Sequence, residues 1–274
     1  MSEKKHGKKA PKAYENKEFL GSPDGRMIRI MAEMMEPMYR FQEERIVDSI
    51  VFFGSARTLD LQDAEEQLKL AQKKGDKENL EEAEINLEMS KYYQGAEDLA
   101  RMLTEWSIKN NYSYYICSGG GPGIMEAANK GAHSVKGGKS IGLNINLPFE
   151  QYPNAYITDE LNFEFNYFFI RKFWFSYLSK ATVVFPGGFG TFDEFFEILT
   201  LIQTKKISKI MPIVLFGKDF WNDVINFDAL VKRKVISKED LDLFVFVDTA
   251  EEAFTYLVTE LERLRKLFPL YHPN

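Results

Sequence analysis

The stretch ATVVFPGGFGTFDEFFEILTLIQTKK, residues 181–206, contains an apolar run, then a glycine cluster, then a segment with helical periodicity. The apolar run is typical of a buried strand, and the glycines mark the turn into a helix that we expect to begin near Thr191. A strand that is apolar throughout and is followed by a helix is the unit from which parallel sheets are built. The stretch therefore predicts one strand, loop and helix of an α/β fold.

The same order recurs along the chain. Further apolar runs typical of strands lie at residues 46–57, 112–121, 140–148, 209–217 and 243–249. Segments with helical character separate them, at residues 123–135, 160–180, 220–235 and 250–268. Apolar strands that alternate with helices predict a parallel sheet covered on both faces. We therefore predict a single α/β domain with a doubly wound, Rossmann-like parallel sheet.

Two regions fall outside this alternation. Residues 1–45 contain a lysine-rich tail and an amphipathic lead-in helix, and the α/β domain is expected over residues 46–274. Residues 59–95 are heavily charged and are predicted to form a helical hairpin inserted into that domain, with its turn at residues 73–79. The charges of the hairpin are most simply a solvated face, and a protein-binding arm is the alternative.

Composition excludes several classes of function. The net charge of -6 and the pI near 5.4 argue against a nucleic-acid surface, which needs clustered Lys and Arg. The single cysteine, Cys117, cannot form an internal disulfide bond, and no apolar stretch reaches the roughly 20 residues that span a membrane. The first residues carry lysines but no apolar segment typical of a signal peptide. We expect a cytoplasmic protein without nucleic-acid or membrane partners.

Three of the predicted strands end in loops rich in small residues. These loops are GSAR from Gly54, SGGGPG from Ser118 and PGGFGT from Pro186. In doubly wound sheets, ligands bind beyond the carboxyl ends of the strands. We therefore expect the three loops to converge on one site.

Neither standard nucleotide-binding motif accounts for these loops. The dinucleotide fingerprint fails because Ile124 occupies the position of its last glycine. The phosphate-binding loop motif nearly matches at residues 137–140, but His133 replaces its first glycine and a strand follows. Neither motif therefore explains how these loops would bind a ligand.

The PGGFGT loop has the properties of a site for a phosphate or another small anion. Glycines free its backbone N–H groups to form a concave nest, and the following helix directs its positive end at the same place. Thr191 adds a hydroxyl group. Alternatively, Thr191 and Glu194 form a capping box that satisfies the first N–H groups of the helix.

Three segments together resemble the LONELY GUY (LOG) family, whose members were once labelled lysine decarboxylases. They are SGGGPGIMEAANKGA at residues 118–132, the pair Arg171 and Lys172, and PGGFGTFDE at residues 186–194. The last contains the PGGxGTxxE motif of the family without a gap. The resemblance implies a phosphoribohydrolase that cuts the N-glycosidic bond of an AMP-like or cytokinin nucleoside 5′-monophosphate, releasing base and ribose 5-phosphate. It also implies a homodimer or a higher homo-oligomer.

The resemblance assigns roles to residues of this sequence. It implies that Glu194 is a catalytic carboxylate near C1′ and that Arg171 holds the phosphate or assists departure of the base. Without the resemblance, the Arg171 and Lys172 pair reads more simply as a surface pair or a helix cap. Glu126 either contacts the ligand or only favours its helix dipole. The residues expected to bind the substrate are Gly54, Ser55, Gly119, Gly120, Gly121, Glu126, Glu150, Lys172, Gly187, Gly188, Gly190, Thr191 and Thr200.

Other readings stay open. The GGGPG loop and the inserted hairpin depart from the plant-type pattern, so a broader purine or pyrimidine nucleotide nucleosidase is the alternative to a cytokinin-forming enzyme. We expect no cofactor and no metal, because nothing around Lys172 or Lys180 supports the pyridoxal phosphate of a decarboxylase. A non-catalytic protein of the same fold that binds a nucleotide or a cofactor, similar to the molybdenum cofactor carrier proteins, is the competing function.

Overall fold

The computed structural model describes residues 10–268 apart from residues 76, 113 and 149–151. Within these residues, seven strands form one sheet in the order β4-β3-β2-β1-β5-β6-β7, and every neighbouring pair is parallel. The strands are β1 (Asp48–Phe53), β2 (Tyr114–Ser118), β3 (Ser140–Ile145), β4 (Asn162–Phe165), β5 (Ser179–Val184), β6 (Ile213–Phe216) and β7 (Val245–Val247). The predicted doubly wound, Rossmann-like parallel sheet is confirmed.

The strand order locates the site. From β1 at the centre, the chain adds β2, β3 and β4 on one side and then returns to add β5, β6 and β7 on the other. The loops after β1 and β5 therefore leave the sheet from adjacent strands in opposite directions. Such a reversal creates a crevice at the carboxyl ends of the two strands, where open α/β sheets bind their ligands.

The edge strand β4 was not predicted, because residues 160–180 were read as an aromatic-rich segment with a helix. In the structure, Asn162–Phe165 pairs with β3, and only Phe168–Leu178 forms the helix α6. Phe163 and Phe165 are buried and Glu164 between them is exposed, which is the alternation of a strand with one covered face. Four residues are too short a run for this alternation to stand out among so many aromatic residues.

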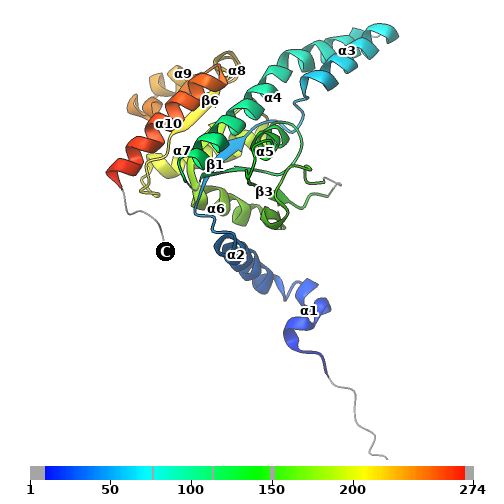
Figure 1. The fold of residues 1–274 in the computed structure, drawn as a ribbon, viewed down its shortest axis with the longest axis vertical. Coiled ribbons are helices and arrows are strands. Elements are labelled where there is room, and N and C mark those ends of the chain that lie inside the picture. Colours follow the sequence, from blue (N-terminus) through cyan, green and yellow to red (C-terminus); the bar gives the residue numbers. More distant parts are fainter. Residues whose placement is uncertain (1–9, 76, 113, 149–151, 269–274) are drawn as a thin grey trace, which may run out of the picture.

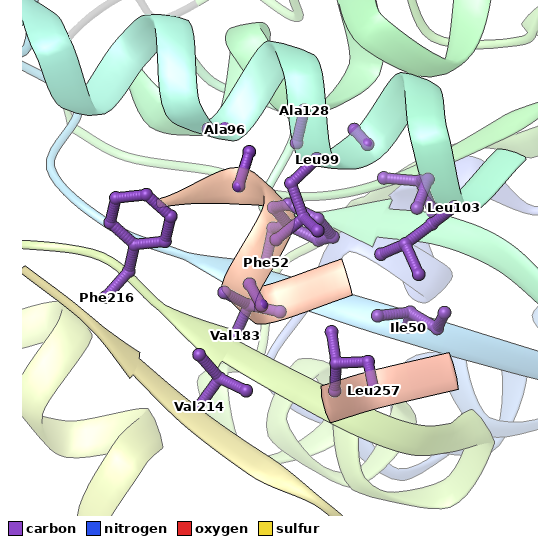
Figure 2. Packing of buried hydrophobic residues seen from close by; sticks show 14 of the residues in the cluster. Ile50, Phe52, Ala96, Leu99, Leu103, Ala128, Val183, Val214, Phe216 and Leu257 are labelled. Atoms are coloured by element: carbon purple, nitrogen blue, oxygen red, sulfur yellow. The ribbon is translucent and has the colours of Figure 1, made fainter. Parts of the chain in front are cut away.

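Helices cover both faces of the sheet (Figure 1). One face is covered by α4 (Lys77–Lys109), α5 (Ile124–His133) and α10 (Ala250–Leu267), and the other by α2 (Arg26–Glu43), α6, α7 (Phe189–Gln203) and α8 (Lys218–Val224). Figure 2 shows Leu99 and Leu103 of α4 facing Ile50 of β1. Side chains alternate along the strand, so Ile50 packs in this layer while Val51 packs in the other. Burial of apolar surface on both faces stabilises the domain.

The inserted hairpin consists of α3 (Leu61–Lys74) and the first part of α4, and it projects from the body of the domain (Figure 1). Asp60 caps the first helix, since its side chain accepts a hydrogen bond from the N–H of Asp63 at 2.8 Å. The helix ends at Gly75, whose φ of 67° suits a glycine. The expected insertion boundary near residue 95 falls within α4, so one continuous helix belongs to both the hairpin and the core.

The lead-in helix α2 docks on α6 through its backbone and one carboxylate. The side chain of Glu33 accepts hydrogen bonds from the N–H groups of Asn166 and Tyr167, and its carbonyl accepts one from Nε1 of Trp174 at 3.0 Å. Before it lies the short helix α1 (Lys17–Gly21). These contacts fix α2 against the amino end of the helix that carries Arg171.

In the described part of the chain, three short 3₁₀ helices and a further α-helix complete the fold. They are η1 (Ala13–Glu15), η2 (Asp159–Leu161), η3 (Glu239–Leu243) and α9 (Phe227–Lys232). The single helix expected over residues 220–235 is two helices, because the side chain of Asn226 caps α9 by accepting from the N–H of Ala229 at 2.8 Å. Within the residues described, none of the helices combines the length and the apolar character needed to cross a bilayer.

Candidate functional site

The three glycine-bearing loops meet, as expected. The N–H of Ser55, after β1, donates to the carbonyl of Pro186, after β5, at 3.0 Å. The carbonyl of Ser55 in turn accepts from the N–H of Ile124, at the start of α5, at 3.0 Å. The first loop therefore lies between the other two and is bonded to both.

Close neighbours surround four glycines of the first two loops, Gly54, Gly119, Gly120 and Gly123. A β-carbon at Gly54 would lie 2.6 Å from the side chain of Ile124, and one at Gly119 would lie 2.7 Å from Sδ of Met125. Gly120 has a φ of +76°, and a β-carbon there would lie 2.3 Å from Oδ1 of Asn144. Gly123 has a φ of +69°, and a β-carbon there would lie 2.3 Å from the carbonyl oxygen of Ser55. At Gly120 and Gly123 the positive φ and the close contacts together require glycine for reasons internal to the protein.

A buried polar network under the second loop was missed by sequence reasoning. The hydroxyl of Ser118 donates to Oδ1 of Asn129 at 2.7 Å and accepts from the N–H of Gly120 at 3.0 Å. Nδ2 of Asn154 donates to the carbonyls of Gly120 and Gly121 at 3.1 and 3.0 Å. Asn129 is fully buried, and an asparagine in an otherwise apolar helix face was the available signal. The network holds the SGGGPG loop in one conformation.

The PGGFGT loop differs from the expectation at its helix start. The helix α7 begins at Phe189 with Gly188 as its N-cap, so Thr191 and Glu194 already lie inside the helix. The capping-box alternative is therefore wrong, because its two residues come too late to reach the first N–H groups. Thr191 is buried and lies against Gly187, where a β-carbon would lie 2.2 Å from the threonine hydroxyl.

Gly188 and Gly190 have no packing reason to be glycine. A β-carbon at either position would meet nothing within 4 Å. The φ of Gly188 is -95°, and Gly190 lies in the first turn of α7, so neither backbone needs the left-handed region. Space is therefore left beside the N–H groups at the positive end of a 15-residue helix.

The two residues expected to be catalytic form a buried ion pair. Nη2 of Arg171, on α6, lies 2.7 Å from Oε1 of Glu194, on α7, and their side chains are 11% and 10% exposed. Nη1 of Arg171 lies 3.9 Å from where a β-carbon of Gly119 would be, so the pair adjoins the second loop. Nε of Arg171 is buried and has no hydrogen-bond partner among the described residues. That arginine keeps a donor for another group.

Burial changes the acidity of Glu194. It raises the pKa of the carboxyl group to about 7, and the nearby guanidinium of Arg171 only partly offsets this by favouring the ionised form. A carboxyl group that titrates near neutral pH can hold or release a proton during a reaction. Strong perturbation of this kind beside a cation and a glycine loop is a feature of functional sites.

Lys172 turns toward the flank of α7. Its ammonium group lies 3.1 Å from Oδ2 of Asp193 and 3.0 Å from Oε2 of Glu197. Burial alone would lower the pKa of Lys172, but its hydrogen bonds to Glu197 and Asp193 outweigh burial and raise the pKa. The lysine therefore stays charged and joins α6 to α7. Its partners indicate a structural role and not a direct contact with substrate.

Glu126 is joined to the inserted hairpin's long helix. Its Oε1 accepts a hydrogen bond from the hydroxyl of Tyr93, on α4, at 2.9 Å. Burial, together with the charge of Glu126, raises the pKa of Tyr93, so the phenol remains a donor. The interaction orients Glu126 in the first turn of α5, next to the glycine loops.

The remaining expected site residues are more peripheral. Ser55 has its hydroxyl engaged as acceptor for the N–H of Arg57 at 3.0 Å. Thr200 is exposed, donates to the carbonyl of Phe196 at 2.7 Å, and lines an open groove of about 520 Å³ along α7. Glu194, in contrast, is buried and paired with Arg171 of α6. Glu150 lies outside the described residues.

The described residues offer no cluster of metal ligands. Among the residues with described positions, no group of three or more His, Cys, Asp and Glu side chains is arranged to hold a metal ion. The groups that the site does present are backbone N–H donors, one arginine and one carboxyl group of raised pKa.

The chain is similar to a known protein family over part of its length. No curated protein matches the chain. A solved structure, of the molybdenum cofactor binding protein from the phototrophic bacterium Rippkaea orientalis, aligns over 79% of this chain and 97% of that one, with 12% identity and a TM-score of 0.45. The model of the family described as "Possible lysine decarboxylase" matches residues 125–257, from α5 into α10, and includes both Arg171 and Glu194. Over this segment, just under half of the chain, the sequence is similar to that family, whose description is the label once given to LOG members.

Proposed function

We propose that the protein hydrolyses the N-glycosidic bond of nucleoside 5′-monophosphates to give a free base and ribose 5-phosphate. The observation that carries the proposal is the buried pair of Arg171 and Glu194 beside a glycine loop with open space at Gly188 and Gly190. The reaction needs an anion site for the phosphate and a carboxylate near the anomeric carbon. The crevice at the junction of β1 and β5 supplies candidates for both.

The phosphate would bind at the start of α7. Backbone N–H groups from residues 188–191 and the helix dipole favour an anion there, and Thr191 adds a hydroxyl group. The absence of side-chain atoms at Gly188 and Gly190 lets phosphate oxygens approach these N–H groups. The glycines of the other two loops would serve to shape the crevice.

Glu194 would act on the sugar. Its ionised form stabilises positive charge at C1′ as the C1′–N bond breaks, and it accepts a proton from the water molecule that attacks C1′. The leaving base takes the bonding electrons and a proton, so the products are free base and ribose 5-phosphate. A pKa of about 7 suits a group that gains and loses a proton near neutral pH.

Arg171 would serve the substrate with the donors that Glu194 does not use. Its Nε is buried and unpartnered among the described residues, which favours a further acceptor in the bound state. A phosphate oxygen or a ring nitrogen of the departing base would satisfy it. The guanidinium also lies over Phe168 and Phe175, at 5.3 and 5.4 Å from their ring centres, which fixes its position.

The decarboxylase described by the family name does not fit these residues. A pyridoxal phosphate enzyme needs a lysine of lowered pKa to form a Schiff base. Lys172, the lysine beside Arg171, is held by two carboxylates that raise its pKa. No step through that cofactor is therefore proposed.

The proposal also covers the oligomeric partner of the protein and the base of its nucleotide substrate. Aromatic side chains are exposed along α6 and α7, namely Phe168, Phe169, Phe173, Tyr177 and Phe189, the last at 95% exposure. Clustered exposed rings favour a protein interface, which supports a homodimer through these helices. We propose a cytoplasmic enzyme that accepts AMP-like nucleotides, with cytokinin nucleotides as the narrower alternative.

The proposal is tested by incubating purified protein with AMP, other nucleoside 5′-monophosphates and the matching nucleosides, and following free base by chromatography. Base release from a monophosphate, with little or none from its nucleoside, is the expected result. Failure to release base from every monophosphate at high protein concentration would refute hydrolysis.

A second function is favoured by one observation. Glu194 already accepts a hydrogen bond from Arg171 at 2.7 Å, which would suit a binding protein whose carboxylate serves only to hold the arginine. In that case the protein would retain an intact nucleotide through purification, and Glu194→Gln would leave retention unchanged. Mass spectrometry of material released from wild type and variant separates the two functions.

A further inference from the structure

A second cavity, of about 470 Å³, lies at the opposite end of the sheet from the glycine loops. Its walls include Asp48 and Tyr114, the first residues of β1 and β2, and Lys180 near the start of β5. The remaining lining residues are Ser208, Lys209 and Ile210 before β6, and Leu261, Leu264, Arg265 and Phe268 from α10 and the residue after it. The cavity thus opens at the amino ends of the strands, and none of the proposed catalytic residues lines it.

The cavity carries an excess of positive charge. Three of its described lining residues are cationic, Lys180, Lys209 and Arg265, and one is acidic, Asp48. Nζ of Lys180 lies 3.4 Å from Oδ1 of Asp48, so this pair is close to neutral. The charges of Lys209 and Arg265 face the same space without a second carboxylate among those lining residues.

Lys209 is held by neutral acceptors. Its ammonium group donates to the carbonyls of Ser176, Tyr177 and Ser179, at the carboxyl end of α6. Burial lowers the pKa of Lys209 to about 8, and repulsion from Lys180 acts in the same direction while Asp48 opposes it. An anion in the cavity would lessen this repulsion and stabilise the charged form.

The rest of the wall suits an apolar group. Leu261 is buried, Leu264 is half-buried, and Ile210, which also lines the cavity, is 54% exposed. Arg265 is braced above the ring of Tyr112, with its guanidinium 4.0 Å from the ring centre. A pre-positioned cation beside aliphatic side chains is an arrangement found in sites for small organic molecules, whose volumes are about 300–1,000 Å³.

We propose that this cavity binds a small organic anion, with a carboxylate or phosphate head near Lys209 and Arg265 and an aromatic or branched apolar body against Leu261, Leu264 and Ile210. The site is separate from the proposed nucleotide site. It shares two elements with that site, since β5 continues into the PGGFGT loop and α6 carries Arg171. An occupant is therefore placed to act on the nucleotide site through these elements.

The test uses ¹⁹F NMR on the full chain. The probes are 4-fluorobenzoate and 4-fluorophenyl phosphate, with 4-fluorobenzamide as the neutral control of similar size. We expect broadening and a shift of the signal for at least one anion and none for the amide. The better anion shows which head group the site accepts.

Substitutions show where on the protein the anion binds. Arg265→Gln should weaken the anion's affinity at least tenfold, whereas Arg263→Gln, two residues along α10 with its exposed side chain paired to Glu260, should change it less than twofold. Arg171→Gln should leave the affinity of 4-fluorobenzoate unchanged, because that residue belongs to the other end of the sheet. Should Arg265→Gln fail to fold, Leu264→Trp, which fills the apolar wall, must weaken binding instead.

Three results would overturn the proposal. Equal binding of the amide and the anions would show that charge is irrelevant. Undiminished binding by Arg265→Gln or by Leu264→Trp would place the anion elsewhere. Loss of binding in Arg171→Gln would assign the probe to the glycine loops. Each outcome is read by direct binding, so it is independent of whether nucleotides are hydrolysed.

Discussion

The SGGGPG and PGGFGT loops are both rich in glycine, and their glycines exist for different reasons. In the SGGGPG loop, Gly120 and Gly123 have positive φ values, and β-carbons at these positions would collide with Asn144 and Ser55. In the PGGFGT loop, Gly188 and Gly190 have ordinary backbone conformations and open space around them. The SGGGPG loop requires glycine to fold, whereas the PGGFGT loop leaves space that the protein does not fill. This difference is the structural argument for a ligand at the start of α7.

The largest effect on catalysis is expected from Glu194→Gln, beside the PGGFGT loop. The amide cannot accept a proton from water, so kcat/KM for AMP should fall by about 10²–10⁴-fold while AMP binding is kept. Steady-state kinetics and calorimetry measure the two quantities. The matched control is Asp193→Asn, whose exposed side chain pairs with Lys172 and should cost less than about tenfold. Equal losses for both variants would contradict the assigned role.

A substitution in the SGGGPG loop should lower the stability of the fold. Gly123→Ala forces a β-carbon against the carbonyl of Ser55 and a strained φ, which should lower the free energy of unfolding by about 2–4 kcal/mol. Urea denaturation measures it. Gly137→Ala is the control, because Gly137 also has a positive φ but open surroundings, and it should cost about 1–2 kcal/mol. A Gly123→Ala protein as stable as wild type would remove the distinction between the loops.

The opposite pattern is expected at Gly190. Valine there has room in the protein but occupies the space assigned to the phosphate, so Gly190→Val should weaken AMP binding at least about tenfold. Its free energy of unfolding should change by less than about 1 kcal/mol. Calorimetry on the Glu194→Gln background avoids turnover. Unchanged affinity would mean that the open space is not the phosphate site.

The pH dependence sharpens the role of the buried pair. The ionised carboxylate is the active form, and burial raises the pKa of Glu194 to about 7. In free enzyme, kcat/KM should therefore fall about tenfold per pH unit below about pH 7. Asp193→Asn removes a negative charge that raises this pKa and should move the acid limb to lower pH. A flat profile down to pH 5 would exclude Glu194 as the titrating group.

Gly190→Ala should have the smallest effect and the most diagnostic sign. Alanine is favoured over glycine in a helix by about 0.5–1 kcal/mol, so the variant should melt at a slightly higher temperature. Its affinity for AMP should nevertheless fall, because the β-carbon points into the open space. A gain in stability without any loss of binding would suggest that the glycine has no functional role.

Much of the fold follows from the sequence because strands buried on both faces read as apolar runs. The runs at residues 46–57, 112–121 and 181–186 each contain a central strand of the sheet. The edge strand Asn162–Phe165 did not stand out, because aromatic residues on both sides hide a four-residue alternation. The division between α8 and α9 depends on one side-chain cap at Asn226, which pattern alone did not resolve.

The site was less predictable than the fold. Convergence of the three loops follows from topology, and the structure does bring Arg171 to Glu194. The engagement of Lys172 by Asp193 and Glu197 depends on how α6 packs on α7, which periodicity does not encode. The capping box was a local pattern, and it failed because the helix begins two residues earlier, at Phe189. The polar network under the SGGGPG loop needs the position of Asn154, which lies far along the chain.

The most direct test of the central claim is a crystal structure of the Glu194→Gln variant soaked with AMP. The account predicts that the 5′-phosphate accepts hydrogen bonds from the N–H groups of residues 188–191 and that the side chain of residue 194 lies under C1′. AMP bound elsewhere with this loop empty, or bound there with its anomeric carbon away from residue 194, would contradict the account.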